Sequence, residues 1–179
     1  MLKAEQCVLL VVDVQGQLAR VVEQSEQLHQ NLETLIKGVQ LFDIPVLCLE
    51  QLPDKLGATS SNIANAIKPF APISKHHFSG WQAYELQQQL TQLGRKQIIL
   101  AGIETHVCVY QTCRDLLDNG FQAHLVIDAV SSRELANKIS GIEMMQSYGA
   151  IQTNVETLLF ELQHHAQGDR FKALLKLIK

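Results

Sequence analysis

The sequence of 179 residues has no excess of positive charge, since its 15 Lys and Arg residues face 18 Asp and Glu residues. Proteins that bind nucleic acid or a membrane surface usually carry a basic patch, and no block of like charge stands out here. We therefore expect neither nucleic acid nor a membrane as a partner. With 46% hydrophobic and 18% charged residues, the composition is that of a globular protein.

Long apolar runs are also missing. The run 7–12 near the N-terminus is short and ends at Asp13, and no small-residue cleavage site follows it. It is too short for a membrane span and unlike a signal peptide. The four cysteines form no C-x-x-C pair, and Cys7 and Cys48 lie in apolar runs. We therefore expect reduced thiols and a cytoplasmic protein.

Short apolar runs alternate along the chain with segments whose apolar residues recur every three or four positions. The first pattern predicts buried strands and the second predicts amphipathic helices. Strict alternation is typical of β-α-β units. The sequence therefore predicts an α/β fold in a single domain over residues 1–179, with six mostly parallel strands and helices on both faces in a three-layer, Rossmann-like arrangement. The predicted strands are 6–12, 45–50, 72–78, 97–102, 122–127 and 150–153, and the predicted helices are 27–42, 83–93, 106–119, 132–147 and 155–162.

Reactive side chains lie at the ends of three predicted strands. Asp13 ends the first strand, Lys75 lies on the third, and Cys108 follows the fourth at the start of a helix. Each alone has an ordinary interpretation, as a turn residue, a solvent-facing charge or a buried filler. However, functional groups gather beyond the C-terminal ends of parallel strands, and a buried lysine needs a counter-charge. Together the three residues predict one site with Cys108 as its nucleophile.

The Cys108 thiol is expected to have a lowered pKa, because a helix N-terminus and a nearby lysine both favour the thiolate. Cys113 lies five positions further along the same predicted helix, on a different face, and we expect it to serve in packing. A redox sensor would need a resolving cysteine beside Cys108. The helical offset makes Cys113 a poor candidate for that role.

Three motifs carry a resemblance to a known family: VVDVQ around Asp13, ISKHHFSG around Lys75 and AGIETHVCV around Cys108. With these motifs in this order, and with the succession of elements from about residue 6 to 160, the sequence resembles the isochorismatase-like (cysteine hydrolase) superfamily. That superfamily includes nicotinamidases and N-carbamoylsarcosine amidase. The segment EQLPDKLGATS is most similar to the small isochorismatase-domain-containing proteins.

The resemblance implies a role for each matched residue. Cys108 would attack an electrophilic carbon, Asp13 would act as general acid and base, and Lys75 would hold the thiolate and Asp13 in register. The Ile103–Glu104 peptide would be cis. The backbone amides of Glu104 and Cys108 would then form an oxyanion hole.

The metal site that the resemblance would imply for a nicotinamidase is missing from the sequence. Nicotinamidases carry an Asp-x-His…His set after the second strand, whereas this chain reads LEQLPDKLGATS there. His76 and His77 are adjacent on a predicted strand, so their side chains would point to opposite faces. We therefore expect no metal and no other cofactor.

The expected reaction is hydrolysis of an amide or related C–N bond in a small-molecule substrate. One alternative is vinyl-ether hydrolysis of the isochorismate type, which relies on the aspartate without needing the thiol. Another is a catalytically weak oligomeric binding or scaffold module on the same fold. The residues predicted to line the substrate pocket are Leu18, Gln51, Phe78, Trp81 and Tyr110, of which Trp81 has packing at a subunit contact as an equal alternative.

A homo-oligomer, a dimer or larger, is expected because oligomers are common in the family that the sequence resembles. The segment GDRFKALLKLIK near the C-terminus is a short basic amphipathic stretch. It places Phe171, Leu174, Leu175 and Ile178 on one side. We expect this side to dock on its own domain or on a neighbouring subunit rather than on a membrane.

Overall fold

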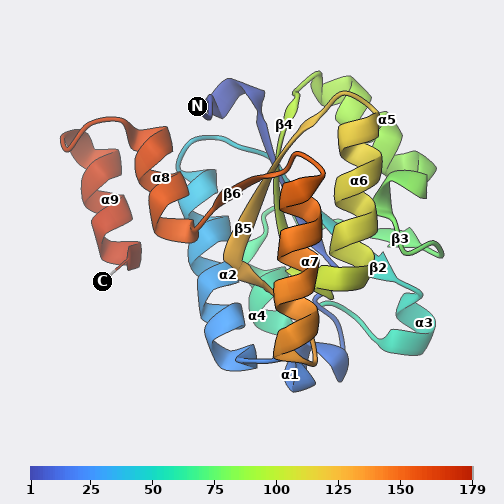
Figure 1. Ribbon diagram of the computed structural model, residues 1–179. Coiled ribbons are helices and arrows are strands. Elements are labelled where there is room, and N and C mark those ends of the chain that lie inside the picture. Colours follow the sequence, from blue (N-terminus) through green and yellow to red (C-terminus); the bar gives the residue numbers. More distant parts are fainter. Residues whose placement is uncertain (179) are drawn as a thin grey trace.

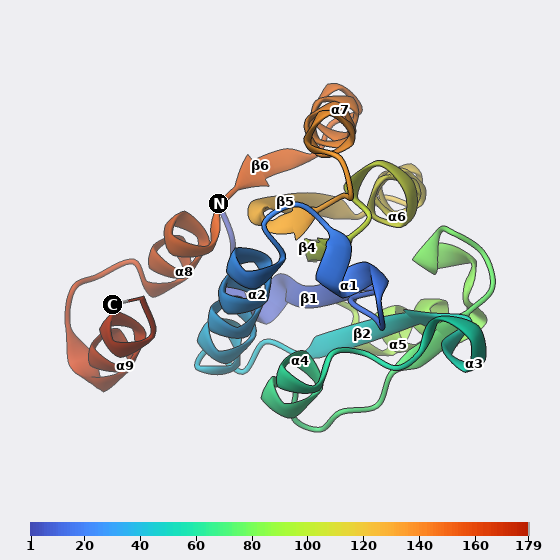
Figure 2. The same ribbon diagram turned by 90° about the horizontal axis from the view of Figure 1, so that it is seen from below.

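The computed structural model describes residues 1–178 and arranges them around a six-stranded sheet in the order β3-β2-β1-β4-β5-β6. The pairings in this sheet are all parallel. Helices cover both faces (Figures 1 and 2), so the predicted α/β fold is confirmed. The strands are β1 (Cys7–Val12), β2 (Val46–Gln51), β3 (Ile73–Lys75), β4 (Gln97–Ile103), β5 (Gln122–Ser131) and β6 (Ile151–Thr153).

The central strand β1 contributes to two separate cores, because successive side chains of a strand point to opposite faces. Leu9 and Val11 belong to the core shared with α2 (Ser25–Gln40) and α8 (Val155–Gln163). Leu10 and Val12 belong to the core shared with α5 (Tyr84–Leu93), α6 (Tyr110–Asp118) and α7 (Leu135–Ser147). Every residue of β1 is buried, so its C-terminal end is firmly held.

Within the part of the chain that the structure describes, five further short helices were not predicted, one before β1 and four in the connections. They are too short to show an apolar stripe in the sequence. They are η1 (Ala4–Gln6), α1 (Leu18–Val21), α3 (Pro53–Leu56), α4 (Ser61–Ala66) and η2 (Gly80–Gln82).

The strand order reverses between β1 and β4. The chain builds outward from β1 to β2 and β3, and later outward from β4 to β5 and β6. In open α/β sheets ligands bind at such a switch point, outside the carboxyl ends of the strands. Figure 2 looks toward this edge, where α1 lies beside the ends of β1 and β4. Asp13 directly follows β1 and the turn that carries Cys108 follows β4.

The third strand is shorter than predicted and the fifth is longer. Since β3 stops at Lys75, His76 and His77 lie in the loop beyond it, and their predicted placement on opposite faces of a strand was wrong. β5 pairs with β4 along one edge and with β6 along the other, and after an irregularity between Leu100 and Gly102 its pairing with β4 returns, so that Ser131 pairs with Ile103. This return brings the residues after β5 next to the turn that carries Cys108.

The helix predicted to start at His106 begins instead with a π-helical turn, η3 (Thr105–Val109), which continues into α6. The Glu104 carbonyl accepts the backbone N–H groups of both Val107, at 3.1 Å, and Val109, at 3.2 Å. Single π turns within helices are frequent at functional sites. This wide turn sets where the Cys108 side chain points.

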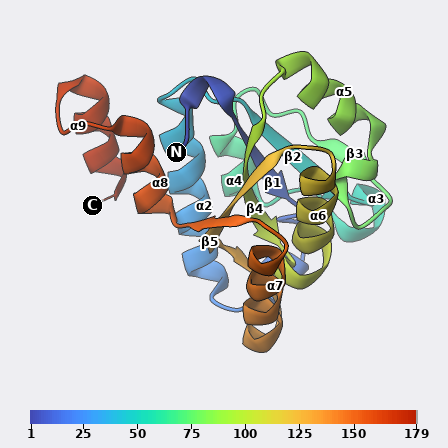
Figure 3. The ribbon, with the colours of Figure 1, turned by 45° about the horizontal axis from the view of Figure 1, so that its top comes forward.

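The C-terminal segment forms α9 (Gly168–Ile178), which lies beside α8 and α2 at one end of the molecule (Figures 1 and 3). Leu174 is fully buried in the core on that side, and the rings of Phe171 and Phe160 lie 6.3 Å apart. The predicted docking of this segment on its own domain is therefore confirmed. Among the described residues, no helix combines the length and apolar character that a membrane span requires.

Gly102 allows the close approach of β4 to β1, and its replacement provides a test of the fold. A Cβ atom at Gly102 would lie 2.1 Å from the Val12 carbonyl oxygen, and its φ angle is +120°. We expect Gly102→Ala to lower the free energy of unfolding by more than about 2 kcal/mol, since backbone strain of this kind alone costs roughly 1–3 kcal/mol.

The control is Gly94→Ala, because Gly94 also has a positive φ but no heavy atom lies within 4 Å of the added Cβ. Urea unfolding of the wild-type protein and of the two variants measures the loss of stability in each. An equal loss for the two variants would show that the contact with Val12 contributes nothing.

Candidate active site

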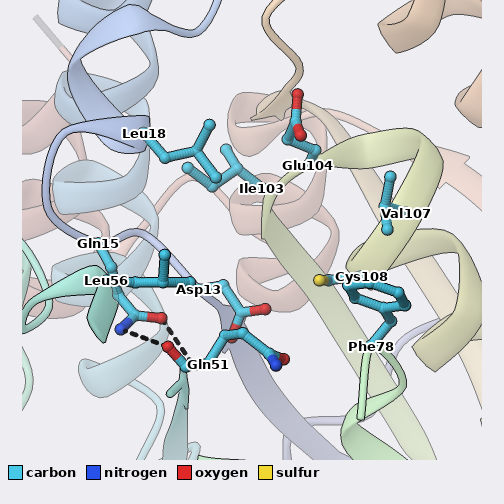
Figure 4. A pocket seen from close by; sticks show the side chains of 10 residues that line it. All are labelled: Asp13, Gln15, Leu18, Gln51, Leu56, Phe78, Ile103, Glu104, Val107 and Cys108. Atoms are coloured by element: carbon cyan, nitrogen blue, oxygen red, sulfur yellow. Dashed lines mark hydrogen bonds between the residues drawn. The ribbon is translucent and has the colours of Figure 1, made fainter. Parts of the chain in front are cut away.

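Asp13, Lys75 and Cys108 come from three different elements and meet at one cavity at the C-terminal edge of the sheet. Asp13 has a φ of +51°, which turns the chain sharply at the end of β1. Figure 4 shows its carboxylate and the Cys108 thiol directed into the same cavity. Both residues line that cavity, whereas Lys75 lies behind Asp13 and is 2% exposed.

The Lys75 ammonium group is buried and contacts four oxygen atoms. It donates to Asp13 Oδ2 at 2.6 Å and to Gln51 Oε1 at 2.6 Å. The carbonyl oxygens of His77 and Phe78 lie 3.2 and 3.1 Å away. A buried charge needs such partners, because its removal from water is otherwise too costly. Lys75 therefore ties the end of β1 to the end of β2 and to the loop that follows β3.

The Asp13 carboxylate is held on one side only. Its Oδ2 accepts the bond from Lys75, whereas Oδ1 is buried and has no hydrogen-bond partner among the described residues. Burial raises the pKa of the Asp13 carboxyl above its ordinary 3.8, although Lys75 and the Cys108 thiol favour the charged form. An unpartnered oxygen on a carboxylate with a raised pKa is suited to accept a proton.

The Cys108 thiol does not ionise easily. Burial and the neighbouring Asp13 anion raise its pKa to about 12, and the opposing effect of Lys75 is smaller. The predicted lowering of this pKa was therefore wrong, because Lys75 pairs with Asp13 and because the residue lies in a closed site rather than at a solvated helix end. Cys108 is a thiol at neutral pH and would need a base when it reacts.

The turn between β4 and Cys108 is fixed from outside by residues that follow β5. The Ile103–Glu104 peptide bond is cis. The Glu104 carboxylate accepts from Arg133 Nε at 3.1 Å, and Ser132 Oγ accepts the Thr105 N–H at 3.1 Å. This clamp was not apparent from the sequence, because it depends on the return of β5 to β4.

Helix α7 packs directly against the same turn. A Cβ atom at Gly141 would lie 2.8 Å from the His106 backbone nitrogen, so only glycine allows this contact. The backbone of the nucleophile turn is therefore held from a second side.

The cavity has a volume of about 120 Å³. Of the residues predicted to line it, Leu18, Gln51 and Phe78 do so, whereas Trp81 and Tyr110 do not. The Trp81 ring packs edge-on against Phe121, with centroids 5.4 Å apart. The residues that line the cavity are Asp13, Gln15, Leu18, Gln51, Leu56, Phe78, Ile103, Glu104, Val107 and Cys108.

Gln15 and Leu56 are lining residues that the sequence did not single out. The Gln15 side chain bridges two loops, since its Oε1 accepts the Gln51 N–H at 2.6 Å and its Nε2 donates to the Gly57 carbonyl at 2.6 Å. Gln15 stands in the VVDVQ motif, which was the available signal. Leu56 belongs to α3, a helix too short to predict.

The sequence profile of a protein family, described as the isochorismatase domain, matches residues 7–157. The chain belongs to the isochorismatase domain family. The matched range contains all six strands of the sheet and all the residues that line the cavity. The family relationship predicted from the three motifs is confirmed.

Two curated relatives of this isochorismatase-family chain cover nearly all of it. The secreted isochorismatase effector Isc1 of Phytophthora sojae is 37% identical over 177 residues, covering 96% of this chain and 84% of the relative. The isochorismatase domain-containing protein 2A of Mus musculus is 34% identical over 179 residues, covering 98% and 84%. The resemblance to the small isochorismatase-domain-containing proteins is thus confirmed as well.

Two solved structures share the fold. The MAR1 ribonuclease of Caenorhabditis elegans superposes with a TM-score of 0.92 at 31% identity, covering 99% of this chain and 91% of that chain. The YcaC gene product of Escherichia coli, described as an octameric hydrolase of unknown specificity, gives a TM-score of 0.92 at 20% identity, covering 98% and 89%. At this lower identity the second match concerns the fold alone.

Histidines of the isochorismatase-family chain lie outside the cavity. His76 and His77 line a separate open hollow with Tyr110 and Arg114. Within residues 1–178, no three side chains of His, Cys, Asp or Glu gather as a metal site would require. The absence of a metal stays a prediction.

Proposed function

We propose that this protein is a metal-independent cysteine hydrolase that cleaves an amide or related C–N bond in a small molecule. Cys108 is the nucleophile, Asp13 the general base and acid, and Lys75 the cation that keeps Asp13 ionised. The observation that carries the proposal is the cavity in which a thiol faces a carboxylate that has one oxygen, Oδ2, tied to a buried lysine and the other, Oδ1, without a partner among the described residues. The family's hydrolytic chemistry supports it.

The first half of the reaction forms a thioester. Asp13 removes the Cys108 proton as the sulfur attacks the substrate carbonyl carbon, so no preformed thiolate is needed. The backbone N–H groups of Glu104 and Cys108 receive the developing oxyanion. The C–N bond then breaks, and protonated Asp13 gives its proton to the departing amine.

The second half releases the acid. A water molecule gives one proton to Asp13 and attacks the thioester carbon. When the C–S bond breaks, the electron pair returns to the Cys108 sulfur, which recovers a proton from Asp13. Both residues end in their starting protonation states, so the chain needs no further reactant.

The cavity favours a small and neutral reactive group. Its wall includes the Asp13 carboxylate, while Leu18, Leu56 and Val107 supply apolar surface. The Lys75 ammonium is already taken by its four oxygen partners. A substrate with carboxylates, such as isochorismate, would meet like charge here, so amide hydrolysis is favoured over vinyl-ether cleavage.

The names of the relatives point to different activities. The MAR1 protein of Caenorhabditis elegans is named a ribonuclease, but the net charge of −3 of this chain does not favour RNA as a substrate. Another relative is described as secreted, whereas the four free cysteines support the cytoplasmic location that we propose for this chain. The octameric neighbour supports a homo-oligomer.

The proposed base can be tested by alkylation of Cys108 with iodoacetamide, itself a small amide, across a pH series read by peptide mass spectrometry. We expect the rate to rise as Asp13 ionises, at a pH above its ordinary pKa of 3.8, and then to stay level through neutral pH. In Asp13→Asn the rate at pH 7 should fall by on the order of a hundredfold, because the base is lost.

Selective labelling of Cys108 would result from the Asp13 base and from the access of the reagent to the thiol, not from a low thiol pKa. Cys7 has a thiol pKa raised only to about 11, yet it is fully buried, whereas Cys108 is 9% exposed. A wild-type rate that climbs tenfold per pH unit up to alkaline pH, as in Asp13→Asn, would contradict the role of Asp13. Uniformly slow labelling of all cysteines would favour the binding or scaffold module.

A further inference from the structure

Lys75 has more hydrogen-bond acceptors than protons to give. An ammonium group carries three N–H donors, but four oxygen atoms lie within 3.2 Å of Lys75 Nζ. The two shortest contacts, both 2.6 Å, are with Asp13 Oδ2 and Gln51 Oε1. The carboxylate and the amide oxygen each hold the ammonium at the same short distance, so both draw on the same positive charge.

The Gln51 amide is held so that its oxygen must face the lysine. Its Nε2 donates to the His76 carbonyl at 3.0 Å, so a reversed amide would place N–H groups against the ammonium. The backbone of Gln51 is fixed as well, because its N–H donates to Gln15 Oε1 at 2.6 Å. Gln51 is only 7% exposed. Its competition with Asp13 is thus a constant feature of the site.

We propose that Gln51 is a positioning residue that draws part of the Lys75 charge away from Asp13 and so sets how readily the Asp13 carboxylate accepts a proton. The proposal rests on the proposed function for its catalytic meaning. The effect of Gln51 on the protonation of Asp13 does not depend on the proposed function, because it follows from the Lys75 ammonium group that the two residues share.

The other charged or titratable groups near Asp13 come from each element packed against it. Lys75 at the end of β3 favours the anion, whereas Glu50 on β2 disfavours it, and the nearby Cys108 thiol from η3 also favours it. Gln51 is the neutral member of this set. Changes at Gln51 can therefore strengthen or weaken the hold of Lys75 on Asp13 without removing either partner.

Two substitutions should move the protonation of Asp13 in opposite directions. Gln51→Glu adds a carboxylate that takes more of the ammonium and repels the Asp13 anion, so the Asp13 pKa should rise by about one pH unit or more. Gln51→Met removes the competing oxygen at similar size, so Lys75 should turn to Asp13 and the pKa should fall. A residue that only fills space would move the pKa in the same direction in both variants.

The measurement is the carboxyl ¹³C chemical shift of Asp13 followed against pH in the full-length protein, with the signal identified by its loss in Asp13→Asn. The control is Gln88→Glu, which adds the same charge at an exposed position on α5 and should leave the Asp13 midpoint in place. Circular dichroism and a thermal melt confirm that each variant is folded. If one Gln51 variant does not fold, the direction in which the Asp13 midpoint shifts in the other variant still tests the proposal.

A second readout is the pH series of Cys108 alkylation in the same variants. If both hypotheses hold, its acid limb shifts with the Asp13 midpoint. If the ¹³C midpoints move as expected but the acid limb of Cys108 alkylation does not shift with them, the proposed function fails and the role of Gln51 stands. If Gln51→Glu and Gln51→Met leave the Asp13 midpoint unchanged, or shift it in the same direction, the role of Gln51 is overturned.

Discussion

Replacement of Cys108 by alanine should abolish hydrolysis of any small amide that the wild-type protein cleaves, with a loss on the order of a thousandfold or more. The reason is that the covalent route disappears, and the site then offers only the carboxylate and the backbone amides to an attacking water. Ammonia release from a panel of small neutral primary amides and ureides measures the effect. Trapping of the thioester with hydroxylamine should also fail in Cys108→Ala.

The matched control for this experiment is Cys113→Ala. Cys113 is fully buried in the core between α6 and the sheet and lies outside the cavity, so its loss should leave the activity in place. Amide hydrolysis that survives in Cys108→Ala but is lost in Asp13→Asn would contradict the covalent route and would indicate that the aspartate acts without the thiol. A wild-type protein with no activity toward any member of the panel, and with an unreactive Cys108, would favour the alternative of a catalytically weak binding or scaffold module.

The positions of Asp13 and Cys108 could be predicted because they depend on register and strand order alone. Asp13 follows β1 and the Cys108 turn follows β4, and these neighbouring strands are aligned so that Val12 pairs with Gly102. Any parallel sheet with this order brings the two residues to the same edge. Lys75 could be predicted for a related reason, since it ends a parallel strand and needs an anion when buried.

The ionisation of the site could not be predicted in the same way. A lysine near a cysteine lowers the thiol pKa only if its charge is available, and here Lys75 lies behind Asp13 with its N–H groups already engaged. The sequence contains the charges but not their order in space. Burial raises the Cys108 pKa to about 12, and the Asp13 anion, which this order places beside the thiol, adds to the effect.

The lining of the cavity was only partly predictable for a similar reason. Trp81 and Tyr110 are close to the reactive residues in sequence, but η2 and the π turn direct them away from the cavity. Leu56 enters it from α3, which packs against the loop after β1: a Cβ atom at Gly16 would lie 2.0 Å from the Leu56 carbonyl. Proximity along the chain is therefore a poor guide where irregular turns intervene.

Lys75→Met should destabilise the protein by about 3–5 kcal/mol at pH 8, because it leaves a buried carboxylate without its cation. The loss should shrink at lower pH. The folded-state pKa of Asp13 is already above its ordinary value, owing to burial, and it should rise further without Lys75. A group with a raised folded-state pKa adds stability that is present at low pH and lost as pH rises through that pKa. Protonated Asp13 is therefore tolerated in the variant, whereas ionised Asp13 is not.

Urea unfolding of Lys75→Met at pH 5.5 and pH 8 tests this sign directly, and Lys75→Met with Asp13→Asn completes the cycle. The second substitution should restore part of the stability at pH 8, since it removes the uncompensated charge, but not all of it, because Gln51 Oε1 still lacks its donor. Lys172→Met is the control: Lys172 is exposed and pairs with the likewise exposed Asp169 on the same helix, so its loss should change stability by less than about 0.5 kcal/mol. A cost for Lys75→Met that is the same at both pH values, and that Asp13→Asn does not relieve, would mean that Lys75 stabilises the fold by packing its loops and not by holding the charge of Asp13.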